Sequence, residues 1–161
     1  MPTVYHNQDN ILEVGEDWLS LLKQEAAQAE RSRARLCLHM SESDSIQEML
    51  IVFCQDAQIK PHRTLNKPES LSVVEGGLRV VMFHDDGTVD RTFEMGAPGS
   101  GRVFMTRFSI GPWYTYVPLT EFVVIHEITR GPFDPADSAY PDWAPDEGPE
   151  LQAFLDRVSA A

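Results

Sequence analysis

The sequence predicts a mainly β protein with a helix near each end, and three observations support this prediction. From about residue 57, short runs rich in β-branched and aromatic residues alternate with turn signals roughly every 8 to 12 residues. Residues 11–31 carry apolar side chains near the helical period of about 3.6 residues. Leu151, Phe154 and Leu155 repeat this spacing after Pro149, a residue suited to a first helical turn.

The length of 161 residues, 42% of them hydrophobic, predicts one domain with a sizeable core over residues 1–161. Within this domain we expect an N-terminal helical extension over 1–50, a barrel over 52–130, and a wrapping tail with a helix over 131–161. The tail is rich in Pro and Asp, which favours irregular chain on the surface.

Two local predictions concern the boundaries of these regions. Asp44 or Ser45 could cap a short helix over residues 46–50, although Met49 to Cys54 could equally open a strand. The Gly76-Gly77 pair predicts a two-residue hairpin loop between the strands that flank it, because glycine adopts positive φ without a Cβ clash.

Composition excludes several classes of function. Lys and Arg number 13 against 25 for Asp and Glu, so the formal net charge is −12 and a nucleic acid would be repelled. No apolar run approaches the roughly 18 residues of a membrane span, and the first residues lack the pattern of a signal peptide. We expect a cytoplasmic protein.

Cys37 and Cys54 lie in apolar runs without metal-type spacing, so we assign them no chemistry.

Residues 61–76 resemble the first cupin motif, in which His-x-His, three or four residues, Glu, six residues and Gly supply metal ligands. His62, Glu69 and Gly76 match this spacing, whereas Thr64 stands at the second histidine. The segment 109–114 resembles the second motif, Pro-x-Gly-x-x-His, with Tyr114 in place of the ligating histidine.

Further blocks resemble the WbuC family of cupin-fold metalloproteins. They are Arg35 to His39, Gln47 to Leu50, Pro61 to Arg63, Lys67 to Ser70, His126-Glu127, Gly131 to Phe133 and Trp143 to Pro145. The resemblance implies a cupin double-stranded β-helix barrel with a divalent metal at its mouth. It also implies an association with bacterial O-antigen or other surface polysaccharide metabolism.

The metal ligands that this resemblance assigns are His62 and Glu69. Thr64 offers a neutral hydroxyl, and Tyr114 would have to lose a proton with an ordinary pKa of about 10, so both replacements weaken metal binding. We therefore expect a metal-free site in preference to a bound divalent transition metal. His39, His126 or Glu127 could still converge on the site from neighbouring strands, which linear spacing does not exclude.

Without a metal, His62 and Tyr114 are the candidate catalytic residues, a base and an acid facing each other across the lumen. Metal-independent sugar-nucleotide epimerases of the cupin superfamily use a similar His and Tyr pair, although a filled barrel interior would equally explain Tyr114. The candidate ligand-binding residues are Thr64, Lys67, Arg107 and Trp113.

Three functions follow as hypotheses. The chain binds a sugar or sugar-nucleotide, acts as a metal-dependent cupin enzyme of isomerase, epimerase or dioxygenase type, or serves as a non-catalytic interaction module. Pairing of barrel edge strands would produce a homodimer. We expect a small-molecule ligand and neither a nucleic acid nor a membrane as partner.

Overall fold

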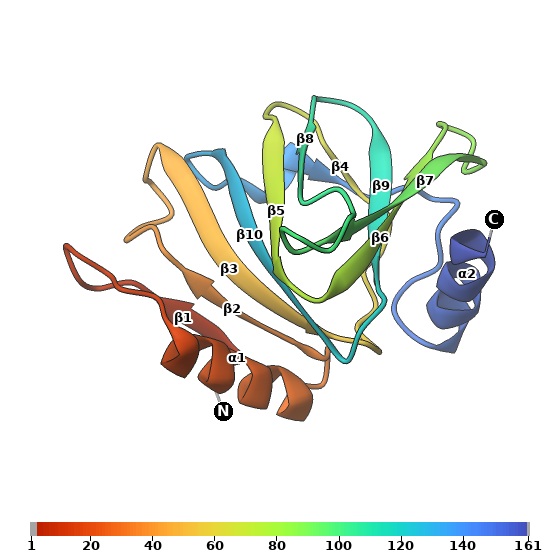
Figure 1. Cartoon of the computed structure of the whole chain (residues 1–161). Coiled ribbons are helices and arrows are strands. Elements are labelled where there is room, and N and C mark those ends of the chain that lie inside the picture. Colours follow the sequence, from red (N-terminus) through yellow and green to blue (C-terminus); the bar gives the residue numbers. More distant parts are fainter. Residues whose placement is uncertain (1–2, 161) are drawn as a thin grey trace.

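The computed structural model describes residues 3–160 and consists of two β-sheets that face each other around a lumen, with one helix outside each sheet (Figure 1). Apolar and polar residues alternate along the strands, and successive side chains of a strand point to opposite faces. Each sheet therefore has an apolar face that can line the lumen. Within the described residues, no helix is long and apolar enough to cross a membrane.

The larger sheet has six strands. Their spatial order is β1 (Val4–His6), β2 (Arg33–Cys37), β3 (Ile46–Cys54), β10 (Phe122–Arg130), β5 (Glu69–Glu75) and β8 (Met105–Phe108). The smaller sheet contains β7 (Val89–Gly96), β6 (Gly77–Phe83) and β9 (Trp113–Pro118), and a short ribbon pairs β11 (Ser138–Ala139) with β4 (Arg63–Thr64). The named strand pairs are antiparallel except β1 with β2. This arrangement is a cupin double-stranded β-helix.

The lumen between the sheets holds the main hydrophobic core. Strands of both sheets contribute to it; its fully buried members include Leu71, Val73, Leu78, Val80, Met95, Val123 and Ile125. These residues occupy alternate positions of their strands, so one face of each strand lines the lumen. This rule decides which of the predicted site residues can meet.

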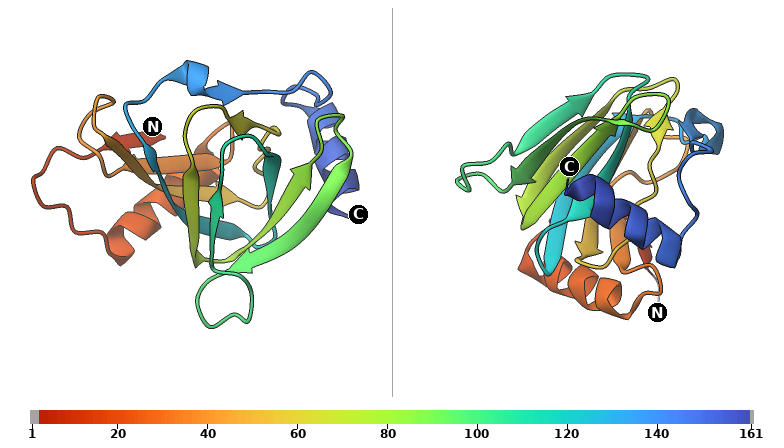
Figure 2. Two further views of the ribbon diagram at one scale, coloured as in Figure 1. Left: turned by 90° about the horizontal axis from the view of Figure 1, so that it is seen from above. Right: turned by 90° about the vertical axis from the view of Figure 1, so that its right-hand side faces the viewer.

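Both predicted helices are present. Helix α1 (Glu16–Gln28) packs Leu22 and Ala26 against the outer face of the larger sheet, while α2 (Pro149–Ser159) packs Leu151 and Phe154 beside the smaller sheet. The two further views in Figure 2 place the helices on different sides of the barrel. A short 3₁₀ turn, η1 (Pro135–Asp137), interrupts the otherwise mostly irregular tail.

The structure corrects two local predictions. Residues 46–54 form one strand, so the strand alternative is confirmed and the short helix over residues 46–50 is wrong. Strands β1 and β2 also fall within residues 1–50, so this part is not simply a helical extension. The predicted hairpin at Gly76-Gly77 is wrong, because β5 pairs with β10 and β8 whereas β6 pairs with β7 and β9.

Gly76 instead forms the corner at which the chain passes from one sheet to the other. It has a φ of 80°, and a Cβ there would lie 2.2 Å from the carbonyl oxygen of Phe122. A glycine is therefore needed for both conformation and space.

Candidate functional site in the lumen

The predicted pair His62 and Tyr114 lies side by side in the structure. Each backbone N–H donates to the other residue's carbonyl at 3.0 Å, and the two rings are 4.6 Å apart between centroids. Tyr114 and Tyr116 occupy alternate positions of β9 and both belong to the lumen core, with exposed fractions of 0% and 2%. The two motif segments thus meet, as the sequence predicts.

Glu69 is a buried carboxylate held by two tyrosines. It begins β5 on the face that carries Leu71 and Val73 into the lumen. The hydroxyls of Tyr114 and Tyr116 both donate to its Oε1, at 3.1 and 2.9 Å. Two hydroxyl donors compensate for part of the water that the carboxylate loses on burial. Glu69 and His62 therefore both adjoin Tyr114.

Glu127 joins this group from β10. Its register partners are Met49 and Leu71, and it follows Val123 and Ile125 at alternate positions, so it faces the lumen. Burial, and then the neighbouring charge of Glu69, raise the pKa of Glu127 well above its ordinary range. One of the three residues that could have converged on the site therefore does so. The signal in the sequence is the alternation Val123, Ile125, Glu127.

One ring nitrogen of His62 is hydrogen-bonded to the backbone, which leaves the other for a ligand. Nδ1 lies 2.9 Å from the carbonyl oxygen of Lys60, which can only accept, so Nδ1 carries the proton of the neutral ring. Nε2 then presents a lone pair. His62 is half-buried, so part of the residue reaches the surface.

The tyrosine hydroxyls remain protonated. Burial, followed by the charges of Glu69 and Glu127, raises the pKa of Tyr114 far above its usual value. The same causes, again led by burial, raise the pKa of Tyr116. Both phenols are thus hydrogen-bond donors to Glu69 and poor sources of a proton for a reacting molecule.

Three predicted ligand-binding residues do not line the lumen. Lys67 is buried elsewhere, with its Nζ 2.7 Å from Asp137 Oδ2. Strand alternation directs Trp113 outward to the cluster around α2, and it directs Arg107 outward beside Ser70. Sequence spacing alone did not distinguish the two faces of these strands.

Thr64 is the fourth predicted ligand-binding residue. It lies two positions beyond His62 and is 6% exposed, so it shares the inward face. Its Oγ1 is buried without a hydrogen-bond partner among the described residues. This hydroxyl therefore retains hydrogen-bonding capacity inside the protein.

The two other histidines considered as ligands lie outside the lumen. His126 Nε2 contacts Glu48 Oε1 at 2.7 Å on the opposite face of β10. His39 Nδ1 accepts from the backbone N–H of Glu48 at 3.0 Å. Between residues 3 and 160, no group of three or more His, Cys, Asp or Glu side chains is placed to hold a metal ion.

Comparison with solved structures agrees with this architecture. Protein SO0799 from Shewanella oneidensis matches with a TM-score of 0.59 and 13% identity, over 90% of both chains. A Bacillus subtilis oxalate decarboxylase, described with Mn(II) centres, matches with a TM-score of 0.50 and 18% identity, over 77% of this chain and 32% of its own. These likenesses define a cupin-fold protein.

The family of this chain follows from its sequence. A family model described as "Domain of unknown function (DUF6016)" matches residues 14–95, and the chain belongs to this family. No curated protein matches the chain. Procruciferin from Brassica napus matches with a TM-score of 0.46 and 15% identity over 55% of this chain, which spans only 21% of the procruciferin chain.

Proposed function

We propose that this chain binds a small polyhydroxylated molecule, a sugar or the sugar part of a sugar-nucleotide, at the mouth of the cupin lumen. The observation that carries the proposal is the convergence of His62, Glu69, Tyr114 and Glu127 from four separate segments. Polar groups gathered inside an otherwise apolar lumen are typical of a binding site, since their burial opposes folding.

The chemistry of the group suits a hydroxylated ligand. His62 Nε2 can accept a hydrogen bond from a sugar hydroxyl, while a protonated Glu127 can donate one. Tyr140, 61% exposed with its ring centroid 6.4 Å from that of His62, offers a flat apolar face to the C–H groups of a sugar ring. Donor, acceptor and aromatic surface together are what a polyol requires.

The resemblance to the WbuC family supports a role in bacterial surface polysaccharide metabolism. It depends on blocks that include the lumen residues His62, Glu69 and Glu127. As a WbuC-like protein, this chain would act on a saccharide in O-antigen metabolism.

The donor set does not fit a four-ligand metal centre. The Tyr114 hydroxyl donates a hydrogen bond to Glu69, and the raised pKa of this tyrosine keeps it protonated. Thr64 contributes only a neutral hydroxyl. The proposal therefore assigns binding to the protein side chains themselves.

A second candidate function is proton transfer on the bound saccharide. The oriented His62 ring favours it, because a neutral imidazole with a free Nε2 can take a proton next to a carbonyl group. In this version Glu127 replaces Tyr114 as the acid, since burial and the neighbouring charge of Glu69 raise the pKa of Glu127, whereas the hydroxyl of Tyr114 is hydrogen-bonded to Glu69.

Calorimetric titration against a panel of free sugars and nucleotide sugars tests the proposal. We expect one class to bind, with at least a tenfold weaker affinity in His62→Ala and in Glu127→Gln. Arg107→Ala, on the outer face of β8, is the matched control and should bind like the parent. Absence of binding across the panel at millimolar concentration would contradict the proposal.

An interaction module is the remaining alternative, and complementation of a deletion strain separates it from ligand binding. If His62→Ala and Glu69→Ala both restore the wild-type phenotype, the lumen is dispensable, and a role as an interaction module is favoured. Loss of complementation with either variant, when its folding is verified by circular dichroism, supports a role for the lumen.

A further inference from the structure

A second buried carboxylate lies outside the lumen, beneath helix α1. Glu25 is 3% exposed, between Leu22 and Ala26, which are both fully buried against the larger sheet. Its Oε2 is buried and accepts no hydrogen bond from the described part of the chain. Burial of a carboxylate oxygen in this state opposes folding unless something compensates for the lost water.

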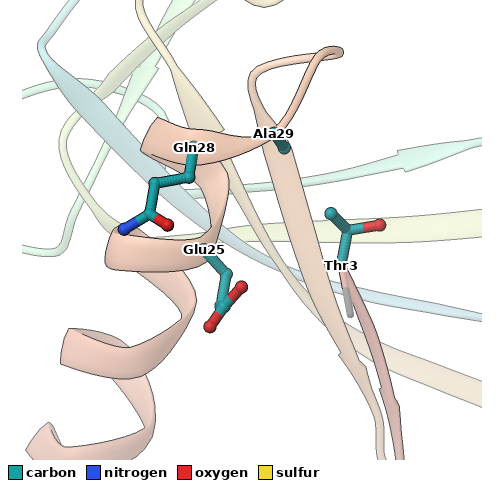
Figure 3. A pocket seen from close by; sticks show the side chains of 4 residues that line it. All are labelled: Thr3, Glu25, Gln28 and Ala29. Carbon is teal, nitrogen blue, oxygen red and sulfur yellow. The ribbon is translucent and has the colours of Figure 1, made fainter. Parts of the chain in front are cut away.

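A pocket adjoins this carboxylate. It has a volume of about 80 Å³ and is lined by Thr3, Glu25, Gln28 and Ala29. Figure 3 shows the Glu25 carboxylate between the helix and the strand that begins after Thr3, with the amide of Gln28 above it. At roughly 30 Å³ for one water in the liquid, the space suits a small ion with one or two waters.

The surroundings favour a positive charge in this pocket. It lies at the C-terminal end of α1, where backbone carbonyls carry partial negative charge and the last turn has no basic residue. Lys23 of the same helix is committed to Glu75, with contacts of 2.7 and 2.6 Å. Burial, then the charge of the adjacent Glu25 carboxylate and a hydrogen bond to it, raise the pKa of Tyr5, so this phenol remains neutral and Oε2 is the oxygen of Glu25 without a donor among the described residues.

We propose that the pocket beneath α1 binds a weakly hydrated monovalent cation of the size of potassium or ammonium, with Glu25 as its charged ligand. One carboxylate balances one positive charge, and Gln28 and Thr3 are the lining residues with neutral polar side chains. Mg²⁺ and Ca²⁺ sites instead use several oxygen ligands with more carboxylates, whereas Glu25 is the single carboxylate among the four described residues that line this pocket. The bound cation stabilises the attachment of α1 to the sheet.

Thermal and urea unfolding of the whole chain test this site. Potassium or ammonium chloride replaces tetramethylammonium chloride at constant ionic strength, so that screening is unchanged. Above the dissociation constant, a tenfold increase in potassium should raise the folding equilibrium constant of the parent about tenfold. Glu25→Gln should show no such dependence, whereas Glu30→Gln, an exposed residue just beyond the helix, should behave like the parent.

Equal potassium dependence in all three proteins, or none in the parent, would overturn the proposal. Crystals of the parent protein grown with rubidium chloride provide a readout that needs no variant. We expect an anomalous peak beside Glu25 Oε2, and its absence at high rubidium concentration would also overturn the assignment. The outcome is independent of the lumen function, because the lumen and this pocket lie on opposite faces of the larger sheet.

Discussion

Glu69 in the lumen and Glu25 beneath α1 are buried to a similar degree, with exposed fractions of 7% and 3%, but their hydrogen bonding differs. Two tyrosine hydroxyls converge on Oε1 of Glu69, whereas Oε2 of Glu25 has no donor within the described residues. The hydrogen bonds to Glu69 come from tyrosines on a strand that packs beside it. Glu25 lies beside a pocket, where its Oε2 can receive a ligand from outside the described residues.

Burial alone therefore does not define a site. A satisfied carboxylate such as Glu69 can orient its neighbours, here Tyr114 and, through it, the ring of His62. A carboxylate with an unpaired oxygen instead provides binding capacity for an ion. The two regions therefore predict different responses to substitution.

The largest effect should come from the apolar surroundings that make both carboxylates costly to bury. Leu22→Ala beneath α1 and Leu71→Ala in the lumen each remove a fully buried side chain, so each should lower the free energy of unfolding by about 2 to 5 kcal/mol. Urea denaturation measures this change. Ile11→Ala, at a position 83% exposed, is the control and should change it by less than about 0.5 kcal/mol. A small loss at either leucine would mean that its region is open to water, and the comparison would no longer hold.

The hydroxyls that hold Glu69 should have the next largest effect. Tyr114→Phe and Tyr116→Phe each leave one donor where there were two, so each should cost about 1.5 to 3 kcal/mol, the range for hydrogen bonds to charged groups. In a Glu69→Gln background the cost of either change should fall, which a double-mutant cycle measures. Tyr140→Phe, at an exposed position, should be nearly neutral. An unchanged stability in both buried variants would show that Glu69 does not depend on these donors.

The third and smallest expected effect is the dependence of the free energy of unfolding on pH that Glu127 causes. Its folded-state pKa is raised by burial and by Glu69, so the stability it contributes is fully present below the ordinary pKa of about 4.5 and is lost as the pH rises toward the folded-state value. One proton changes the free energy of unfolding by at most about 1.4 kcal/mol per pH unit. Urea denaturation between pH 4.5 and pH 8 should therefore show a shallower decline in Glu127→Gln than in the parent. Parallel curves would argue that Glu127 is ionised at neutral pH and would weaken its assignment as a donor.

Much of the fold was accessible from the sequence. Both helices were predicted from the apolar spacing around Leu22 and Leu151, and the strands between them from alternation and glycine turns. The hairpin at Gly76 was predicted wrongly because a positive-φ glycine suits a tight turn and a corner between sheets equally. Short-range pattern does not reveal which strand lies beside which.

The candidate site was predicted in part. The pairing of His62 with Tyr114 and the inward face of Glu69 followed from the motif spacing. Lys67 and Trp113 were assigned to the ligand because they lie near the motifs in sequence, yet Lys67 pairs with Asp137 and Trp113 packs toward α2. Nearness along the chain is a poor guide in a strand, since adjacent side chains point to opposite faces.

The β-rich class, the two helices and the inward face of Glu69 follow from local sequence, because these depend on periods of two and 3.6 residues within one segment. Which carboxylate receives hydrogen bonds depends on how distant segments pack together. The hydroxyls that reach Glu69 come from residues 45 and 47 positions away, and the space beside Glu25 exists only where α1 meets the first strand of the sheet. Such contacts depend on the pairing and packing of distant segments, which no local pattern encodes.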